Sequence, residues 1–166
     1  MRLLVGGHVV LTLGQLARTR LHFERDLLIR LCENPAVVLR AEDRLGSGSD
    51  PLICTGGWPG SAVCALLDAL RDAGARFEHH GDFDWEGLAI GRWLRERYGA
   101  LSWRFDAAAY RSAVAAASTP LPVLKRSRHA AAGDDGLAAE LERHGVVVSE
   151  EAVLDELVSD LGRATT

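Results

Sequence analysis

Three acidic residues stand just after two segments of the sequence that read as strands. Glu33 follows the segment 27–32, and Asp82 and Asp84 follow the segment 75–80. If both segments belong to one parallel sheet, their carboxyl ends meet at the edge where open α/β sheets bind ligands. Clustered carboxylates with no basic residue among them favour a hard divalent cation, Mg²⁺ or Mn²⁺. The pattern therefore predicts a metal site for chemistry on phosphate groups.

Three carboxylates in one place repel one another strongly. At ~4 Å and an effective dielectric constant near 20, each like-charged pair costs about 4 kcal/mol. Without a cation, the pKa of at least one of these carboxyl groups should therefore rise. Glu86, two residues after Asp84, is a fourth candidate ligand. The structural alternative is that Glu86 is a first-turn acid of a helix and that Asp84 is the cap of that helix.

Alternating strand and helix patterns position these residues. Strands are expected over 27–32, 52–54, 75–80 and 101–105, with a brief further strand over 146–148. Helices are expected to begin near residues 13, 35, 61, 86, 107, 137 and 150, with Ser61 and Ser149 as caps of two of them. This alternation indicates an α/β fold with a mainly parallel four-stranded sheet flanked by helices on both faces. Residues 1–25 are expected to lead into a catalytic domain over 26–162.

Composition restricts the possible functions. The 166-residue chain has a formal net charge of −4, whereas a free-standing DNA-binding domain usually has a basic surface. If the chain acts on DNA, another segment or a partner must supply much of the phosphate affinity. No apolar run is long enough to span a membrane, so no membrane partner is expected. Three cysteines without a Cys-x-x-Cys pair indicate reduced thiols in a cytoplasmic protein.

Three local motifs resemble a known family. They are Cys32-Glu33-Asn34-Pro35, Cys54-Thr55-Gly56-Gly57 and Gly81-Asp82-Phe83-Asp84-Trp85-Glu86-Gly87. A Glu after the first strand and an Asp-x-Asp after the third resemble the Toprim domain, a Rossmann-like metal-binding fold of topoisomerases, primases and certain nucleases. Taken in order, the motifs are more similar to the C-terminal domain of JetD-like proteins. Those proteins belong to the Wadjet plasmid-defence systems and are related to the A subunit of topoisomerase VI.

The resemblance implies a nuclease. JetD-like subunits cut double-stranded plasmid DNA after an SMC-like ATPase complex has extruded it, so metal-dependent phosphodiester hydrolysis is expected. Carried over by position, Glu33, Asp82 and Asp84 would be metal ligands and catalytic residues, with Glu33 as general base or acid. The implied partners are plasmid DNA, SMC-like subunits, a preceding N-terminal region and a second copy of the chain. Activity of the isolated domain is expected to be weak or absent.

One departure concerns the nucleophile. Topoisomerase relatives use a tyrosine on a separate winged-helix domain, and only Tyr98 and Tyr110 occur here, neither in such a context. Hydrolysis by water is therefore favoured over a covalent tyrosyl intermediate.

Several residues outside the acidic motifs are candidate DNA contacts. The expected contacts are Thr55, Gly56 and Gly57 through backbone N–H groups, and Arg92, Lys125, Arg126 and Arg128 through their charges. Plain turn glycines and solvated basic side chains are the structural alternatives. His79 and His80 are candidates for a proton shuttle or a partner of a carboxylate, against the alternative of histidines without a role at the site.

Two other functions remain open. A phosphatase of the haloacid-dehalogenase type also uses Asp-x-Asp after a strand, but has a Thr or Val where Glu86 stands here. A non-catalytic scaffold, with an acidic edge that docks a partner or positions DNA, fits the acidic composition equally well.

Overall fold

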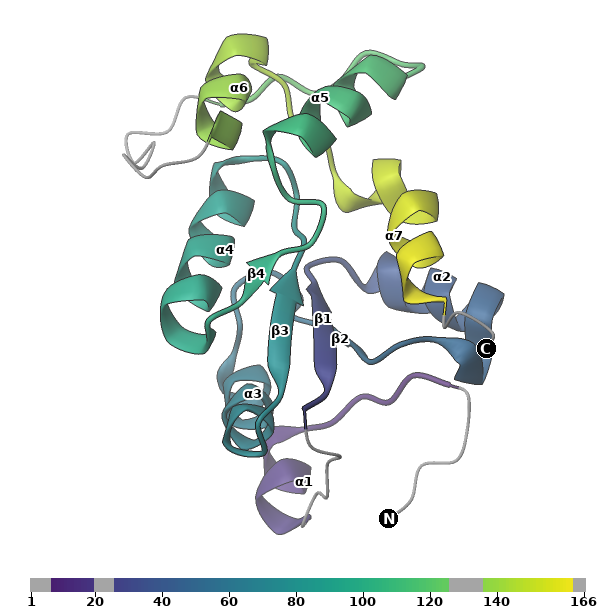
Figure 1. Ribbon diagram of the computed structural model, residues 1–166, viewed down its shortest axis with the longest axis vertical. Coiled ribbons are helices and arrows are strands. Elements are labelled where there is room, and N and C mark those ends of the chain that lie inside the picture. Colours follow the sequence, from purple (N-terminus) through teal and green to yellow (C-terminus); the bar gives the residue numbers. More distant parts are fainter. Residues whose placement is uncertain (1–6, 20–25, 126–135, 163–166) are drawn as a thin grey trace.

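A computed structural model describes residues 7–19, 26–125 and 136–162. In these ranges, four parallel strands form one sheet in the order β2-β1-β3-β4. The strands are β1 (Leu28–Cys32), β2 (Leu52–Cys54), β3 (Arg76–His79) and β4 (Leu101–Ser102). The α-helices are α1 (Leu13–Arg18), α2 (Pro35–Leu45), α3 (Ser61–Asp72), α4 (Trp85–Tyr98), α5 (Ala107–Ala116), α6 (Gly136–His144) and α7 (Leu154–Leu161). The predicted α/β fold is confirmed (Figure 1).

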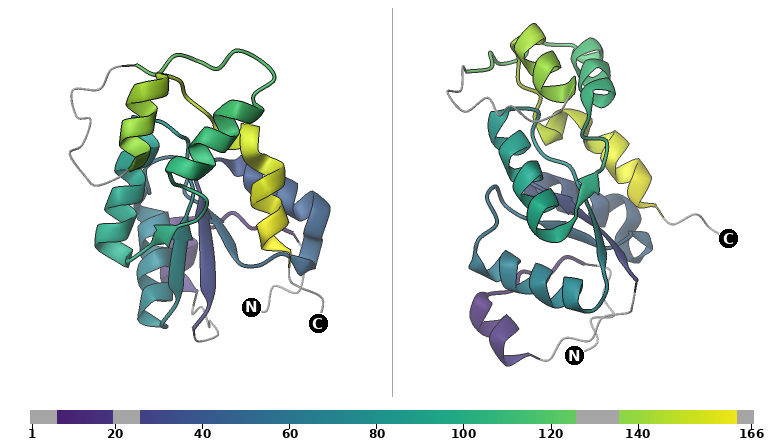
Figure 2. Two further views of the ribbon diagram at one scale, coloured as in Figure 1. Left: turned by 45° about the horizontal axis from the view of Figure 1, so that its top comes forward. Right: turned by 60° about the vertical axis from the view of Figure 1, so that its left-hand side comes forward.

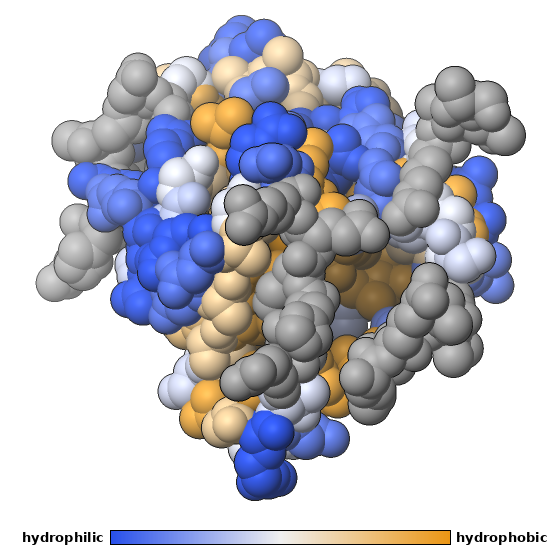
Figure 3. Space-filling model, turned by 60° about the horizontal axis from the view of Figure 1, so that its bottom comes forward, coloured by the Kyte–Doolittle hydropathy of each residue, from blue (hydrophilic) through white to orange (hydrophobic). Residues whose placement is uncertain are grey.

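Helices cover both faces of the sheet. α3 and α4 lie on one face, and α2 and α7 lie side by side on the other (Figures 1 and 2). α5 and α6 pack together beyond the carboxyl ends of the strands. α1 lies against α3 near the amino ends of the strands. Figure 3 views this end, where hydrophilic side chains surround smaller apolar patches. No helix in the described ranges has both the length and the apolar character needed to cross a membrane.

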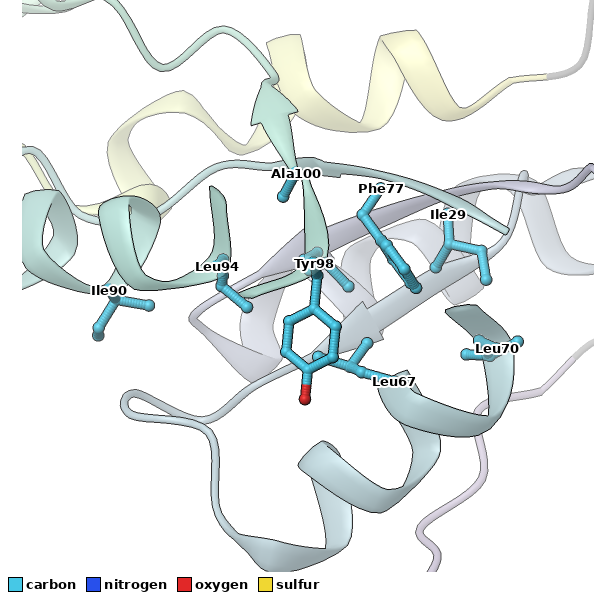
Figure 4. Close-up of a cluster of buried hydrophobic side chains, with 9 residues drawn as sticks. Ile29, Leu67, Leu70, Phe77, Ile90, Leu94, Tyr98 and Ala100 are labelled. Atoms are coloured by element: carbon cyan, nitrogen blue, oxygen red, sulfur yellow. The ribbon is translucent and has the colours of Figure 1, made fainter. Parts of the chain in front are cut away.

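The core between the sheet and α3 and α4 is apolar. β1 contributes Ile29 and Leu31, and β3 contributes Phe77 (Figure 4). They pack on a helical layer composed of Leu67, Leu70, Ile90, Leu94 and Tyr98. Alternation along β1 places the intervening residues on the opposite face of the sheet. This layer supports the β1 and β3 ends that carry the predicted acids.

The opposite face of the sheet includes a charged residue, Arg30 of β1. Its guanidinium donates hydrogen bonds to Glu78 (3.2 Å), Asp50 (3.3 Å) and the carbonyl oxygen of Asp160 (2.9 Å). It also lies over the ring of Trp103, 5.3 Å from the ring centroid. These partners allow a cation in a half-buried strand position, because burying an unpaired charge would be costly. Beside it, α2 and α7 pack through Val37, Ala41, Leu157, Val158 and Leu161.

A third cluster joins α5 and α6 to the carboxyl ends of the strands. Phe83, which lies between the two predicted aspartate ligands, is buried in it with Phe105, Tyr110, Leu141 and Val148. The rings of Phe83 and Phe105 stack with centroids 5.2 Å apart. Phe83 thereby anchors the acidic loop.

One predicted strand is too long, and another is absent. β4 ends at Ser102 instead of residue 105, because Arg104 adopts a positive φ of 47° that turns the chain. The segment 146–148 is not a strand, since Val148 and Val146 form only isolated bridges to Phe83 and Val123.

Two predicted helix caps are also wrong. Ser61 is the first residue of α3, and Gly60 occupies its cap position without a side-chain bond. Ser149 makes no side-chain cap, and a 3₁₀ turn, Glu150–Val153, precedes α7. This turn determines where Glu150 points.

Candidate metal site

The ends of β1 and β3 bring Glu33 and Asp82 to one edge of the sheet. The two strands are parallel neighbours with Leu31 opposite His79. The N–H of His80 donates to the carbonyl oxygen of Leu31 (3.0 Å), which extends this pairing beyond β3. Glu33 immediately follows β1, and Asp82 comes three residues after the end of β3. The edge lies beneath α5 and α6 in Figure 1.

The Glu33 carboxyl group lies in an electrostatically unfavourable place. Its Oε2 atom is buried and has no hydrogen-bond partner among the described residues. Burial and the negative charge of Asp82 raise the pKa of Glu33 to about 7, while a backbone hydrogen bond from Asp82 acts in the opposite direction. The charges of Asp84 and Glu86 raise this pKa further. The four acids are therefore close enough to repel one another.

Asp82 and Asp84 each use one oxygen to organise the loop. Asp82 Oδ1 accepts the N–H of Glu150 (2.8 Å), and Asp84 Oδ1 accepts the N–H of Gly87 (2.8 Å) as the cap of α4. Burial nevertheless raises the pKa of Asp82 above its ordinary value. Glu86 is exposed in the first turn of α4. The cap explanation for Asp84 is thus correct, and it concerns only one of its two carboxylate oxygens.

Glu150 ties the two strand ends together. Its side chain is fully buried, and its carboxylate accepts the N–H groups of Glu33 (2.9 Å) and Asn34 (2.5 Å) at the start of α2. Its own N–H donates to Asp82, as described above. Burial raises the pKa of Glu150 to about 8, with further contributions from the charges of Asp82 and Glu33. One residue far along the chain thus holds the backbone of one predicted ligand and the side chain of another.

Two glycines make room for this arrangement. A Cβ atom on Gly87 would lie 2.1 Å from the carbonyl oxygen of Asp82, so the first turn of α4 approaches the acidic loop closely. A Cβ atom on Gly81 would lie 2.9 Å from Glu33 Oε2 and 3.3 Å from His79 Nε2. The first clash is with backbone, and the second is with the mobile end of a side chain.

The two glycines should therefore respond differently to alanine. Gly87→Ala must move the start of α4 and should lower the free energy of unfolding by about 3 kcal/mol. Gly81→Ala can be accommodated by rotation of the Glu33 carboxyl group and should cost less than about 1 kcal/mol. It should still weaken Mn²⁺ binding, because Glu33 is displaced. Urea unfolding and calorimetric titration with Mn²⁺ measure both effects, and equal losses of stability would contradict this difference.

The two histidines at the end of β3 have different surroundings. His80 is 1% exposed, and its Nδ1 lies 3.0 Å from the carbonyl oxygen of Trp103, which makes Nδ1–H the donor. His79 is 2% exposed, and the Nε2 atoms of both rings have no partner among the described residues. Burial lowers the pKa of His79 to about 3 and that of His80 to about 4, so both rings are neutral at pH 7.

The glycine-rich loop after β2 supports the backbone of Glu33. The N–H and hydroxyl groups of Thr55 both bond to the carbonyl oxygen of Cys32, at 2.8 and 3.2 Å. The N–H of Gly56 donates to the carbonyl oxygen of Glu33 (3.1 Å). Gly56 and Gly57 both have positive φ values, which explains glycine at these positions. Two of the N–H groups predicted to meet phosphate therefore have partners already, and DNA binding by this loop stays a prediction.

The basic candidates are spread over the surface. Arg92 is exposed on α4 and pairs with Glu96 (3.1 Å). The carbonyl oxygen of Lys125 accepts the indole N–H of Trp85 (3.0 Å), which ties this residue to the start of α4. Arg126 and Arg128 lie outside the described residues. Contact of any of these residues with DNA remains a prediction.

The acids suit a hard cation in donor type. They are all oxygen donors, and Glu33 Oε2 is buried without a partner, an arrangement that a cation would stabilise. The positions of these side chains, however, do not form a complete metal site. Within the described parts of the chain, no three His, Cys, Asp or Glu side chains converge closely enough to hold a metal as they stand. A cation would therefore have to draw the carboxylates inward by side-chain rotation.

Comparison with known proteins places the chain in a family. The family model described as Protein of unknown function C-terminus (DUF2399) matches residues 9–161. The chain belongs to this family. The DUF2399 match includes Glu33, Asp82, Asp84 and Glu150, so the whole acidic edge lies inside the family domain. No curated protein and no solved structure matches the chain significantly.

Glu150 is the residue of this DUF2399 site that sequence reasoning missed. Ser149-Glu150-Glu151 reads as the start of a helix, where acids suit the helix dipole, and this signal gives no hint of a second role. At this turn Glu151 and Ala152 are exposed, whereas Glu150 is buried. The role of Glu150 depends on the 3₁₀ turn beside Glu33, which no local pattern specifies.

Proposed function

We propose that this DUF2399 chain is a metal-dependent DNA nuclease module. It would hydrolyse phosphodiesters with Mg²⁺ or Mn²⁺, as the Toprim-type catalytic domain of an SMC-like, JetD-containing plasmid-defence complex. The proposal is supported most by the buried, unpartnered Glu33 Oε2 beside Asp82, at the carboxyl edge of a parallel sheet. Uncompensated acids at this place are characteristic of a site that functions with a cation.

The residues would divide the work as follows. Glu33, Asp82 and Asp84 would hold the cation, with Glu86 at the rim as a fourth acid. A bound divalent ion would neutralise the acids and polarise the phosphodiester. The resemblance to the Toprim-type nucleases also gives Glu33 the role of general acid or base. Glu150 would keep the start of α2 and the Asp82 side chain in place.

The test is cleavage of supercoiled plasmid together with direct measurement of metal binding. Wild type should bind Mn²⁺ and, as an isolated domain, nick or linearise plasmid weakly with Mn²⁺ but not with EDTA, and Asp82→Asn should lose both properties. The assay needs low salt, because a chain of net charge −4 binds DNA weakly. Asp72→Asn, an exposed aspartate at the end of α3, is the matched control and should behave as wild type.

One observation favours the scaffold alternative. The described acids do not converge on one point, which suits an acidic docking surface as well as a metal site awaiting its ion. Calorimetry separates these two functions, because a scaffold would show no Mn²⁺ binding. Hydrolysis of a generic phosphomonoester in the same buffers would instead favour the phosphatase alternative.

A further inference from the structure

Two buried polar atoms without partners lie on the same side of Gly81. They are Glu33 Oε2 and His79 Nε2, both unpartnered among the described residues. Glu33 Oε2 lies 2.9 Å, and His79 Nε2 lies 3.3 Å, from the position that a Cβ atom on Gly81 would occupy. The two atoms therefore lie no more than about 6 Å apart, a separation that one water molecule or a rotation of the Glu33 side chain would bridge.

The surrounding structure holds the His79 ring in this place. His79 is the last residue of β3 and is almost fully buried. A Cβ on Gly91 of α4 would lie 3.1 Å from its Nδ1, so the helix passes directly against the ring. Phe105 meets the ring edge-on, with centroids 5.5 Å apart. Gly81, Gly91 and Phe105 thus border the imidazole on three sides.

A histidine without a partner at Nε2 is a poor core residue. An unsatisfied polar atom in a buried position carries a desolvation cost that a phenylalanine of similar volume would not have. His80, the next residue, is also unpartnered at Nε2, but its Nδ1 bonds to a backbone carbonyl oxygen and three aromatic rings surround its imidazole. His79 Nε2, in contrast, has the buried carboxylate oxygen of a predicted catalytic acid nearby.

We propose that His79 is a positioning residue for Glu33. Its neutral ring carries the proton on Nε2, and this N–H holds the Glu33 carboxylate, directly or through one water, in the orientation that faces Asp82. The inference rests on the proposed function, because the orientation of Glu33 is significant only if Glu33 serves the metal site. Hydrogen bonds of this kind behind a ligand typically change metal affinity 10- to 100-fold.

The first test determines which ring nitrogen of His79 carries the proton, and it needs no metal. Long-range ¹H–¹⁵N spectra of the histidine rings of the whole chain at pH 8 should show His79 as the Nε2–H tautomer and His80 as the Nδ1–H tautomer. The Nδ1–H tautomer at His79 would overturn the inference, because Nε2 would then have no hydrogen to donate.

The second test uses three variants and calorimetric titration with Mn²⁺ without DNA. His79→Phe removes the donor at similar volume and should weaken Mn²⁺ binding at least about tenfold, with an unchanged or higher melting temperature. His79→Gln, whose amide N–H can replace Nε2–H, should restore affinity to within about threefold of wild type. His80→Phe is the matched control at the next position and should bind Mn²⁺ as wild type does. In plasmid cleavage, His79→Phe should lower kcat and leave KM for DNA unchanged.

The outcomes separate this inference from the proposed function. If wild type binds Mn²⁺, Asp82→Asn does not, and His79→Phe binds as tightly as wild type, the inference is wrong and the metal site stands. If His80→Phe weakens binding as much as His79→Phe does, the effect is general loss of packing and the inference is also wrong. If wild type binds no Mn²⁺, both proposals are wrong together.

Discussion

Glu33→Gln should abolish metal-dependent DNA cleavage and yet make the metal-free protein more stable above pH 7. Loss of a catalytic acid or base typically lowers the rate by a factor of about 100 or more, and loss of a metal ligand adds to this effect. The stability change has the opposite sign because the ionised Glu33 carboxylate repels Asp82, Asp84 and Glu86 in the folded protein.

The pH dependence of this stability change follows from the direction in which folding shifts the pKa of Glu33. Folding raises the pKa of Glu33 from 4.5 to about 7, so the folded state binds the proton more tightly than the unfolded chain does. The contribution to stability is fully present below pH 4.5 and is lost as the pH rises through 7. One pKa unit corresponds to about 1.4 kcal/mol, and solvent screening of this half-buried group reduces the total, so the gain in Glu33→Gln should be about 1–2 kcal/mol at pH 8.

Urea unfolding at pH 4.5 and pH 8, with EDTA and with Mn²⁺, measures this change. With EDTA, the variant should exceed wild type at pH 8 and match it at pH 4.5. With Mn²⁺, wild type should gain stability from binding and the variant should gain little. Glu142→Gln, an exposed glutamate of α6, is the control and should match wild type throughout. A variant that is less stable than wild type at pH 8 with EDTA would contradict the repulsion inferred for this site.

Glu150→Ala should damage both the fold and the site. It leaves the N–H groups of Glu33 and Asn34 without their carboxylate acceptor and opens a cavity at a fully buried position. An unsatisfied buried donor costs about 1–3 kcal/mol, so a total loss near 3 kcal/mol is expected. Mn²⁺ binding should fall as well, because the start of α2 and the Asp82 side chain lose their common anchor.

Glu150→Gln separates the charge from the hydrogen bonds. The amide oxygen can still accept from the two N–H groups, so this variant should fold as well as wild type below pH 4.5. Folding raises the pKa of Glu150 from 4.5 to about 8, which means that wild type loses stability as the pH rises from 4.5 through 8. Glu150→Gln has no such titration and should be more stable than wild type at pH 9 by about 2–4 kcal/mol.

Thermal unfolding with EDTA at pH 5, 7 and 9 tests the predictions for the two Glu150 variants. Glu150→Ala should be destabilised at pH 5, whereas Glu150→Gln should nearly match wild type at pH 5 and exceed it at pH 7 and further at pH 9. A Glu150→Gln variant as unstable as Glu150→Ala at pH 7 would show that the carboxylate charge, and not the acceptor oxygens, holds the start of α2.

Much of this fold could be predicted because its signals are local. Cap chemistry marks three helix starts, at Asn34-Pro35, Asp84 and Asp106. In the structure, Asn34, Asp84 and Asp106 are the N-caps of α2, α4 and α5, and Pro35 is the first residue of α2. The apolar segments around β1, β2 and β3 gave strand positions within one residue of those observed. Parallel pairing of β1 and β3 then necessarily places Glu33 and Asp82 at a common edge.

The tertiary structure decided what depends on contacts between distant segments. The length of β4 and the absence of a strand over 146–148 follow from the turn at Arg104 and from the packing of Val148 beside Phe83. The role of Glu150 and the unpartnered state of His79 exist only once β1, β3 and the turn before α7 are in place. Local chemistry thus determined which acids the chain offers and at which strand ends they stand. Burial and long-range hydrogen bonding decided their charge state and support, since both depend on neighbours far apart in the chain.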